Sequence, residues 1–239
     1  MIKLQVTSDL HGYLPEITKE FDLLLICGDI CPAHDHYYAF QYQWIIYDFI
    51  PWIKSLPFKD DNSKVIMIWG NHDFIGENIT NETRSELMHL TDNRLVILNF
   101  EEYIYKYLDE NDGDYKELKI FGSPYCETFG NWAFMRDLDK LEKIYDCMPD
   151  NIDILITHDA PTLGNLGLIQ EGKYAGTMAG NKALDNIIMK QKPKYVFCGH
   201  IHTGNHELNY VEGITMCNVS IKNEFYQAVY DILEIELDN

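Results

Sequence analysis

The sequence has few basic side chains for its length. Its 239 residues include 19 Lys and Arg against 38 Asp and Glu, which gives a formal net charge of −19. A protein that follows a nucleic-acid polymer presents a basic stripe to the phosphates, so the charge argues against a nucleic-acid polymer as partner. The same acidity argues against docking on an anionic membrane.

Long apolar runs are also missing. No run reaches the roughly 18 residues that a membrane span needs. The first residues, MIKLQVTSDLHG, enter a strand-like run without the apolar region and cleavage site of a secretory signal. The six cysteines form no CxxC pair, and their spacing does not suggest a disulfide framework. We therefore expect a reducing, cytoplasmic environment.

Repeats, low-complexity tracts and linkers rich in Pro, Gly or Ser are absent, so we expect residues 1–239 to form one domain. Short apolar runs alternate with longer helical patterns, which is typical of layered α/β or α+β folds. The predicted strands are Lys3–Thr7, Leu23–Cys27, Val65–Trp69, Leu95–Leu98, Leu118–Phe121, Ile154–Thr157, Tyr195–Cys198, Thr215–Val219 and Gln227–Glu236. The predicted helices are Tyr37–Leu56, Glu82–Leu90, Leu138–Cys147 and Lys182–Gln191.

Single residues refine these boundaries. Pro51 should kink or divide the first helix, because proline lacks a backbone N–H. Asn181 is a suitable N-cap for the last helix. The string NDGD at Asn111–Asp114 predicts a hairpin turn between Glu102–Leu108 and the strand that follows, and Glu212–Gly213 predicts a second tight turn.

The residues capable of chemistry are concentrated where predicted strands end. Five apolar runs are followed at once by Asp, His or Asn. These segments are Ser8–Gly12, Gly28–Asp29, Gly70–Asp73, His158–Asp159 and Gly199–His202. Ligands in open α/β sheets bind outside the carboxyl ends of the strands, so the five segments can converge on one site.

Seven of these residues are suitable metal ligands. They are Asp9, His11, Asp29, Asn71, His158, His200 and His202. Their carboxylate, imidazole and amide groups, with no thiolate, suit Mn²⁺, Fe, Zn²⁺, Ni²⁺ or Co²⁺. Seven ligands are too many for one tetrahedral ion. They suit two ions that share a carboxylate, the arrangement that stabilises the attacking and leaving oxygens in phosphoryl-group hydrolysis.

The five segments resemble the five-part motif of the calcineurin-like metallophosphoesterase superfamily. The strings are DLHG at Asp9–Gly12, GD at Gly28–Asp29, GNHD at Gly70–Asp73, THD at Thr157–Asp159 and GHIH at Gly199–His202. FGSPYCETFGNWAF at Phe121–Phe134 and HDAP at His158–Pro161 are similar to the compact branch that includes small class III phosphodiesterases. The resemblance implies a single domain folded as a four-layer αββα sandwich, with two mixed sheets flanked by helices.

The resemblance also implies a role for each matched residue. One divalent ion would be held by Asp9, His11, Asp29 and His202, and the second by Asp29, Asn71, His158 and His200. Asp29 would bridge the two ions, of which Mn²⁺ is the expected metal. A water or hydroxide between the ions would be the nucleophile. His72 resembles the histidine that contacts the phosphate and protonates the leaving oxygen.

The chain departs from the family pattern at one position. Many members have GDxxD, whose second Asp orients the catalytic histidine, whereas this chain has Pro32 at that place. Asp73, next to His72, and Asp35, in the adjacent loop, are the candidate replacements. We expect His72 and Asp73 to be the catalytic pair.

Three further residues are candidate substrate contacts. His34 lies near Asp29 in the sequence and belongs either to the substrate site or to a polar loop. Tyr125 and Trp132 lie in the segment that resembles the pocket side of the family. Their rings either stack on a nucleobase or pack within the loop.

These features predict a metal-dependent phosphodiesterase that hydrolyses a small nucleotide-like ester, such as a cyclic nucleotide. The same two ions also serve a phosphomonoesterase, including a protein phosphatase. A nuclease is disfavoured by the charge, and an inactive scaffold by the complete ligand set. The expected partner is a small phosphate ester. Nothing in the sequence indicates an oligomer.

Overall fold

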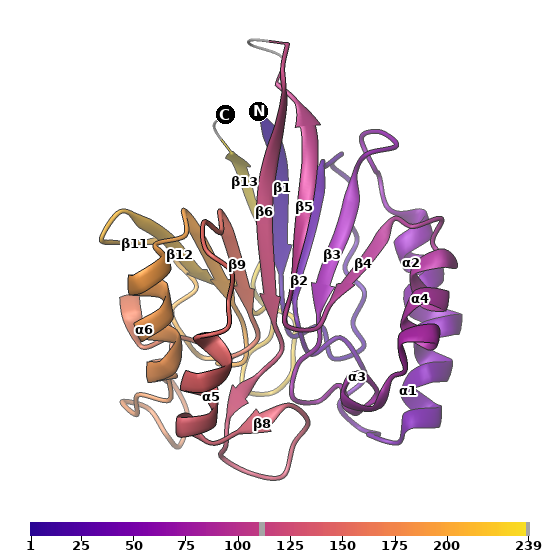
Figure 1. The fold of residues 1–239 in the computed structure, drawn as a ribbon. Helices are drawn as coiled ribbons and strands as arrows, with labels where there is room; N and C mark the ends of the chain where they lie inside the picture. Colours follow the sequence, from indigo (N-terminus) through magenta and orange to yellow (C-terminus); the bar gives the residue numbers. More distant parts are fainter. Residues whose placement is uncertain (110–112, 238–239) are drawn as a thin grey trace.

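Two β-sheets packed face to face form the centre of the computed structural model, which describes residues 1–109 and 113–237 (Figure 1). The first sheet has the order β13 (Leu233–Leu237), β1 (Ile2–Thr7), β2 (Leu23–Cys27), β3 (Lys64–Ile68) and β4 (Leu95–Leu98). Strands β1 to β4 are parallel, whereas β13 pairs antiparallel to β1. The first sheet is therefore mixed.

The second sheet is mixed as well. Its order is β11 (Asn209–Val211), β12 (Ile214–Asn218), β10 (Tyr195–Cys198), β9 (Ile154–Thr157), β6 (Tyr115–Ser123) and β5 (Glu101–Leu108). The edge strands β11 and β5 run antiparallel to their neighbours, and the inner pairs are parallel. Two short parallel strands, β7 (Cys126–Glu127) and β8 (Met135–Arg136), form a separate pair.

Helices cover the outer face of each sheet (Figure 1). The helices on the first sheet are α1 (Tyr38–Trp44), the π-helical η1 (Ile45–Phe49), α2 (Ile50–Ser55), α3 (Phe74–Asn78) and α4 (Asn81–His89). Those on the second sheet are α5 (Leu138–Tyr145) and α6 (Lys182–Gln191), and a short 3₁₀ turn, η2, spans Leu163–Asn165. The predicted αββα sandwich is thus confirmed.

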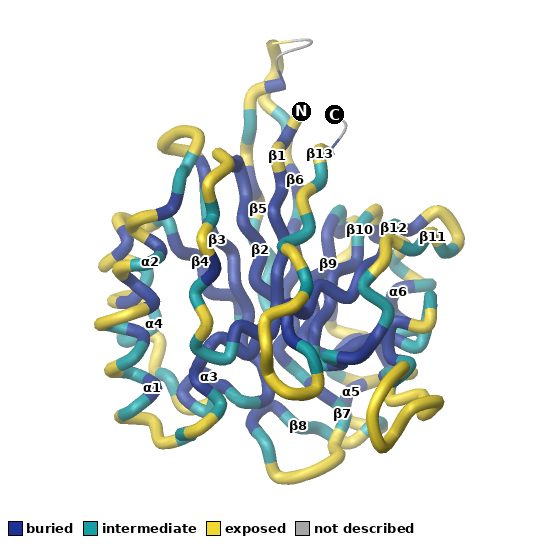
Figure 2. The backbone as a smooth tube through the Cα atoms, turned by 180° about the vertical axis from the view of Figure 1, so that it is seen from behind, coloured by how far each residue is buried: buried dark blue, intermediate teal, exposed yellow. Residues whose placement is uncertain are grey.

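The buried side chains alternate in a way that explains these layers. In β2, Leu23, Leu25 and Cys27 face the core between the two sheets, whereas Leu24 and Ile26 face the helices. A strand buried on both faces must be apolar along its whole length. Figure 2 shows the central strands buried, whereas exposed residues lie on the helices, the loops and the edge strands such as β5 and β13.

Three predicted elements differ from the structure or lie partly outside it. The first helix is divided as expected, and the π-helical turn just before Pro51 relieves the clash between the proline ring and the preceding carbonyl groups. The strand predicted from Gln227 begins only at Leu233, because β13 pairs with β1 over the five residues from Ile2 to Val6. Part of the predicted Asn111–Asp114 turn lies outside the described residues.

Other local predictions are confirmed. The side chain of Asn181 accepts hydrogen bonds from the first backbone N–H groups of α6 and so caps that helix. The residues Glu212 and Gly213 form the tight turn between β11 and β12, both at positive φ. Among the described residues, no helix is both long and apolar enough to cross a membrane.

The two sheets present their carboxyl ends at the same end of the sandwich, opposite the chain termini (Figure 1). Just beyond β1 and β12, Ser8 and Ser220 form a parallel bridge that joins the sheets at this end. The segments that follow β1, β2, β3, β9 and β10 therefore meet there. They carry all seven predicted metal ligands.

Candidate metal centre

The first group of donors comes from the turn after β1 and the loop after β10. The Nε2 atom of His202 lies 3.2 Å from Oδ1 of Asp9 and 3.2 Å from Nε2 of His11. The Nδ1 atom of His11 is buried and has no hydrogen-bond partner. Two imidazole nitrogens and a carboxylate that converge in this way offer three ligand atoms within 4.8 Å of one another.

The second group of donors centres on His158, which follows β9. Its Nε2 atom lies 2.9 Å from Oδ1 of Asn71 and 3.3 Å from Oδ2 of Asp29. The Nδ1 atom of His158 is 2.8 Å from the carbonyl oxygen of Cys27, so Nε2 is the nitrogen that faces the other donors. The same Oδ2 atom of Asp29 lies 3.6 Å from Nε2 of His11. Asp29 therefore lies between the two groups.

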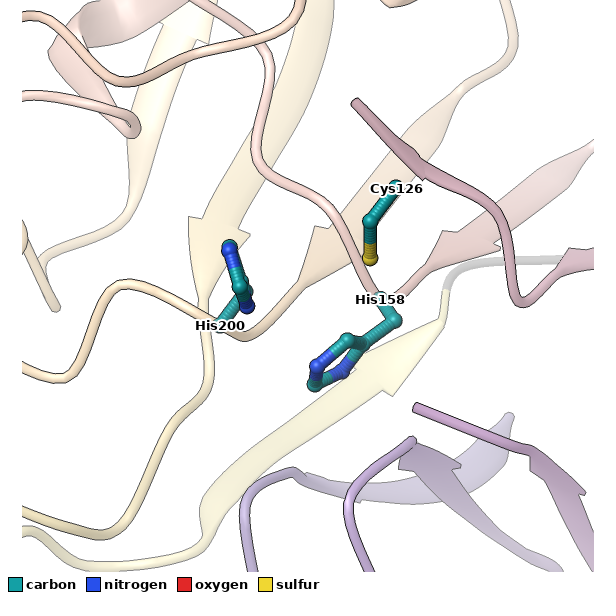
Figure 3. A group of neighbouring side chains, drawn as sticks. All are labelled: Cys126, His158 and His200. Carbon is teal, nitrogen blue, oxygen red and sulfur yellow. The ribbon is translucent and has the colours of Figure 1, made fainter. Parts of the chain in front are cut away.

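His200 lies beside this second group together with a cysteine. The ligand atoms of Cys126, His158 and His200 are within 4.8 Å of one another, and Figure 3 shows the sulfur and the two rings together. Burial raises the pKa of the Cys126 thiol well above its ordinary value. The sequence suggested a donor set without sulfur, and this neighbouring thiol could not be foreseen because Cys126 is remote from every motif histidine in the chain.

Two buried carboxylates, Asp9 and Asp29, dominate the electrostatics of the centre. Burial would raise the pKa of Asp9 and of Asp29, but hydrogen bonds and the charges of His202 and His158 outweigh burial and lower both values. Burial would lower the pKa of His158, but Asp29 raises it to about 10. Burial lowers the pKa of His11 to about 4 and that of His200 to about 3. The two carboxylates raise the pKa of His158 and of His202, whereas His11 and His200 stay neutral. Buried carboxylates and imidazoles are ligands that suit divalent cations.

The backbone is bent sharply to bring these donors together. Asp9, His11, Asp29 and His200 all have positive φ values, between 45° and 70°. Such conformations are costly for residues with side chains and occur where the surrounding structure imposes them. At Gly28, a Cβ atom would lie 2.6 Å from Nδ1 of His158, so only glycine allows the strand end to approach that ring.

The predicted catalytic His72 lies at the edge of the same centre. Its backbone N–H donates to Oδ1 of Asp29 at 2.7 Å, and its ring centroid is 5.0 Å from that of His11. Burial lowers the pKa of His72, and the negative charge of Asp29 partly opposes this. The Nδ1 atom of His72 lies 3.1 Å from Nε2 of His36, a residue that the sequence did not single out as its partner.

Residues 2–204 match the calcineurin-like phosphoesterase family. The chain belongs to this family. Its members are metal-dependent phosphoric ester hydrolases, and the converging carboxylate, imidazole and amide groups fit divalent metal ions.

Named relatives are similar to much of this chain. The chain is 28% identical to a UPF0046 protein of Caenorhabditis elegans, over 97% of its own length and 81% of the relative's. It is also 28% identical to human metallophosphoesterase domain-containing protein 1, over 79% of its own length and 58% of the relative's. Another UPF0046 protein of C. elegans is 31% identical, over 53% of this chain and 32% of the relative.

Two solved structures have the same fold. The phosphopantetheinyl hydrolase PptH of Mycobacterium tuberculosis superposes with a TM-score of 0.55 at 13% identity, covering 99% of this chain and 96% of that one. GAP50 of Plasmodium superposes with a TM-score of 0.54 at 9% identity, covering 92% and 71%. At these identities the likeness concerns the fold alone.

In this calcineurin-like phosphoesterase, Asp73 has a different place from the one predicted. Its carboxylate accepts hydrogen bonds from the backbone N–H groups of Ile30, Cys31 and Gly70, at 2.8–3.2 Å. These residues follow Asp29 and precede Asn71, so Asp73 ties together the two strand ends that carry those donors. The other candidate, Asp35, accepts from the backbone N–H of Tyr37. Neither carboxylate is a hydrogen-bond partner of the His72 ring.

We expect Asp73→Ala to lower the free energy of unfolding by about 3–5 kcal/mol, because each buried donor left unpaired costs about 1–3 kcal/mol. Three buried N–H groups would lose their acceptor. Urea unfolding of the metal-free protein measures the change. A loss below about 1 kcal/mol, the net value of one ordinary hydrogen bond, would contradict this role.

Asp73→Asn is the nearest control, because its amide oxygen can still accept from Ile30 and Gly70, whereas its NH₂ group replaces the oxygen that accepts from Cys31. Burial and the charge of Asp29 raise the pKa of Asp73 from 3.8 to about 7. When the pKa of a carboxyl group is higher in the folded protein than in the unfolded chain, its contribution to stability is fully present at pH values below the unfolded pKa. That contribution is lost as the pH rises toward 7. We therefore expect the gap in stability between the native protein and Asp73→Asn to narrow from pH 4 to pH 7.

A cavity of about 820 Å³ opens beside the metal centre. It is lined by Asp29, Asn71, His72, His200 and His202 and by the aromatic residues Phe129, Trp132, Tyr174 and Tyr226, among others. The Trp132 ring is 4.4 Å from the His72 ring, centroid to centroid. Trp132 therefore lines the cavity beside His72, and its contact with substrate stays a prediction.

The other two predicted substrate contacts do not line this cavity. The ring of Tyr125 packs near those of Phe100 and Phe134, within the core beneath the loop. The ring of His34 packs against Phe40 on α1. Both residues contribute to packing, which was the alternative that the sequence left open.

Tyr226 is a cavity residue that the sequence did not indicate. Its ring lies 4.8 Å from that of His11 and 5.1 Å from that of His202, centroid to centroid. It is held at a φ of 60° by the Asn223–Gln227 turn, in which the Asn223 side chain accepts from the backbone N–H groups of Phe225 and Gln227. This turn precedes the strand that the sequence predicted from Gln227 and shares only that residue with it, and no motif marks the turn.

Proposed function

We propose that this calcineurin-like phosphoesterase is a dinuclear metal-dependent phosphodiesterase that hydrolyses a small nucleotide-like ester, such as a cyclic nucleotide. The observation that carries the proposal is the position of Asp29. One of its carboxylate oxygens lies 3.6 Å from His11 and 3.3 Å from His158, each of which belongs to a separate group of donors. Two ions that share a bridging carboxylate require such a placement.

The two groups of donors supply a ligand set for each ion. Asp9, His11, Asp29 and His202 would hold the first, and Asp29, Asn71, His158 and His200 the second. When bound, divalent ions neutralise phosphate charge and lower the pKa of water toward neutrality. Oxygen and imidazole donors suit Mn²⁺, with Fe, Zn²⁺, Ni²⁺ and Co²⁺ as alternatives.

The charge of the cavity supports this dependence on metal. Among the described residues that line it, Lys173 is the one Lys or Arg, whereas Asp29, Glu127, Asp159, Glu171 and Glu224 are acidic. A phosphate group would be repelled by such a lining unless bound cations compensated it. The negative surface of the whole chain also disfavours a nucleic-acid polymer as substrate.

The chain's own side chains would position the ester. His72 lines the cavity at the edge of the donor groups, where it can donate a proton to the leaving oxygen. Phe129, Trp132 and Tyr226 provide aromatic surfaces on which a nucleobase can stack. A volume of about 820 Å³ matches sites that enclose a ligand the size of a nucleotide.

A comparison of esters tests the proposal. We expect Mn²⁺-loaded protein to hydrolyse bis-p-nitrophenyl phosphate faster than p-nitrophenyl phosphate, to lose turnover in EDTA, and to recover it when Mn²⁺ is restored. Metal analysis should give two equivalents per chain. A faster rate on the monoester would make the chain a phosphomonoesterase. No turnover of either ester with any divalent metal, with the fold intact, would exclude an enzyme.

We further propose that residues 1–239 make up one catalytic domain. The family match ends at residue 204, but the segments beyond it contribute strands to both sheets. β12 pairs with β10, and β13 pairs with β1. This pairing supports a single folding unit that includes the last strands.

A further inference from the structure

His36 makes a direct hydrogen bond to the ring of the proposed general acid. Its Nε2 atom lies 3.1 Å from Nδ1 of His72. The ring of His36 also packs 5.1 Å from that of Phe74 and 5.4 Å from that of Trp132, centroid to centroid. The ring of His36 is therefore held in place both by its hydrogen bond to His72 and by packing on the two aromatic rings.

Within residues 1–109 and 113–237, no carboxylate makes a hydrogen bond to the ring of His72, which His36 contacts instead. Pro32, which stands where the family pattern has an aspartate, lies against Gly12 in the turn after β1. A Cβ atom on Gly12 would be 2.8 Å from the Cγ atom of Pro32. Asp73 and Asp35 are engaged with backbone N–H groups. Among the described residues, His36 is the side chain hydrogen-bonded to the His72 ring.

The two histidines are fixed relative to each other by one buried side chain, that of Gln41 on α1. Its Nε2 atom donates to the carbonyl oxygen of His72 at 2.8 Å and lies 3.5 Å from that of Asp35, which precedes His36. Its Oε1 atom accepts from the backbone N–H of Ile75 at 2.9 Å. One amide therefore holds the loop that carries His36 and the turn that carries His72.

We propose that His36 is the positioning residue for His72. The hydrogen bond occupies Nδ1 of His72 and fixes the plane of its ring, so that Nε2 is the nitrogen left for the ester. This inference rests on the proposed function, in which a hydroxide oxygen bonds to phosphorus and the P–O bond to the leaving group breaks. The electron pair of that bond goes to the leaving oxygen, and the Nε2 proton of His72 moves to the same oxygen. His36 itself does not touch the substrate. A histidine thus takes the orienting role that an aspartate has in the family pattern.

The variants His36→Gln and His36→Asn test this role as a matched pair. The amide of glutamine reaches the position of the histidine Nε2 atom, whereas the shorter asparagine amide does not. The substrates are methyl aryl phosphodiesters whose leaving groups range from p-nitrophenol to unsubstituted phenol, since only the poorer leaving group depends on proton donation. With the phenyl ester we expect H36N to lower kcat about tenfold and H36Q to stay within about twofold of the native protein. The tenfold loss is a part of the roughly 10²- to 10⁴-fold that general acid catalysis contributes.

Three further readouts separate positioning from a merely structural effect. With the p-nitrophenyl ester, both variants should match the native protein. Metal content should be unchanged. In the His72→Ala background, H36N should cause no further loss, because the two residues act through one proton transfer. The exposed His89, changed to Gln, is the control for loss of a histidine elsewhere. Should H36N fold poorly by near-UV circular dichroism, His36→Ser also removes the hydrogen bond to Nδ1 of His72.

The possible results are distinguishable. If H36N behaves as the native protein with every leaving group, or if its effect adds in full to that of His72→Ala, the positioning role is wrong while the phosphodiesterase stands. If the native protein hydrolyses none of these diesters with any divalent metal, the proposed function fails, and this inference fails with it.

Discussion

Asp29→Asn is expected to disable both halves of the metal centre at once. Its Oδ2 atom faces His11 in one donor group and His158 in the other, so removal of the charge weakens both. We expect fewer than one equivalent of metal per chain after loading with Mn²⁺. We also expect diester turnover to fall by about 100- to 1000-fold or more. Losing one preorganised electrostatic group in an active site typically costs about that much in kcat. Metal analysis and kcat measurements check the two effects.

Asp48→Asn is the matched control for this substitution, because it makes the same change on an exposed residue of η1. It should leave metal content and turnover unchanged. Loss of a single equivalent in Asp29→Asn, with the other ion held as tightly as in the native protein, would contradict the bridging role. Circular dichroism establishes that the variant remains folded.

His72→Ala is expected to separate chemistry from metal binding. His72 touches the centre through its backbone N–H to Asp29, and alanine retains that N–H. Metal content should therefore stay the same. The rate on esters with poor leaving groups should fall about 10²- to 10⁴-fold, as expected for loss of a general acid. The ring also packs on Trp132, so a modest rise in KM can accompany the change.

The outcome that would contradict this role is loss of metal from His72→Ala. The imidazole would then act as a ligand, or its packing would be needed to hold the donor groups together. The ratio between rates on p-nitrophenyl and phenyl esters provides a second check. It should rise in the variant, because a good leaving group needs no proton.

The parts of the fold that could be predicted are those set by short-range pattern. Continuous apolar runs such as Leu23–Cys27 have to be buried on both faces. The structure forms that strand over the residues predicted for it. The candidate ligands could be predicted in the same way, since Asp29 and His158 directly follow such runs. Strand ends that meet at one edge bring their next residues together, whatever their separation in the chain.

The parts that could not be predicted depend on long-range contacts. His36 lies in a polar loop whose sequence gives no sign of its partner, and contacts distant in sequence, such as those of the Gln41 amide, bring that loop to His72. Asp73 follows His72 in sequence, yet its carboxylate is taken by three backbone N–H groups of neighbouring strand ends. Neighbours in sequence were thus poor guides to neighbours in space at this site.

The placement of the donors between the two sheets has a mechanical consequence. Asp9, Asp29 and Asn71 follow strands of the first sheet, whereas His158, His200 and His202 follow strands of the second. Bound ions would therefore cross-link the two halves of the sandwich by coordination, much as a covalent bridge would. Since the unfolded chain cannot assemble these ligands, the free energy of metal binding adds to that of folding. Metal supply would then govern how long the folded protein lasts as well as how fast it turns over substrate.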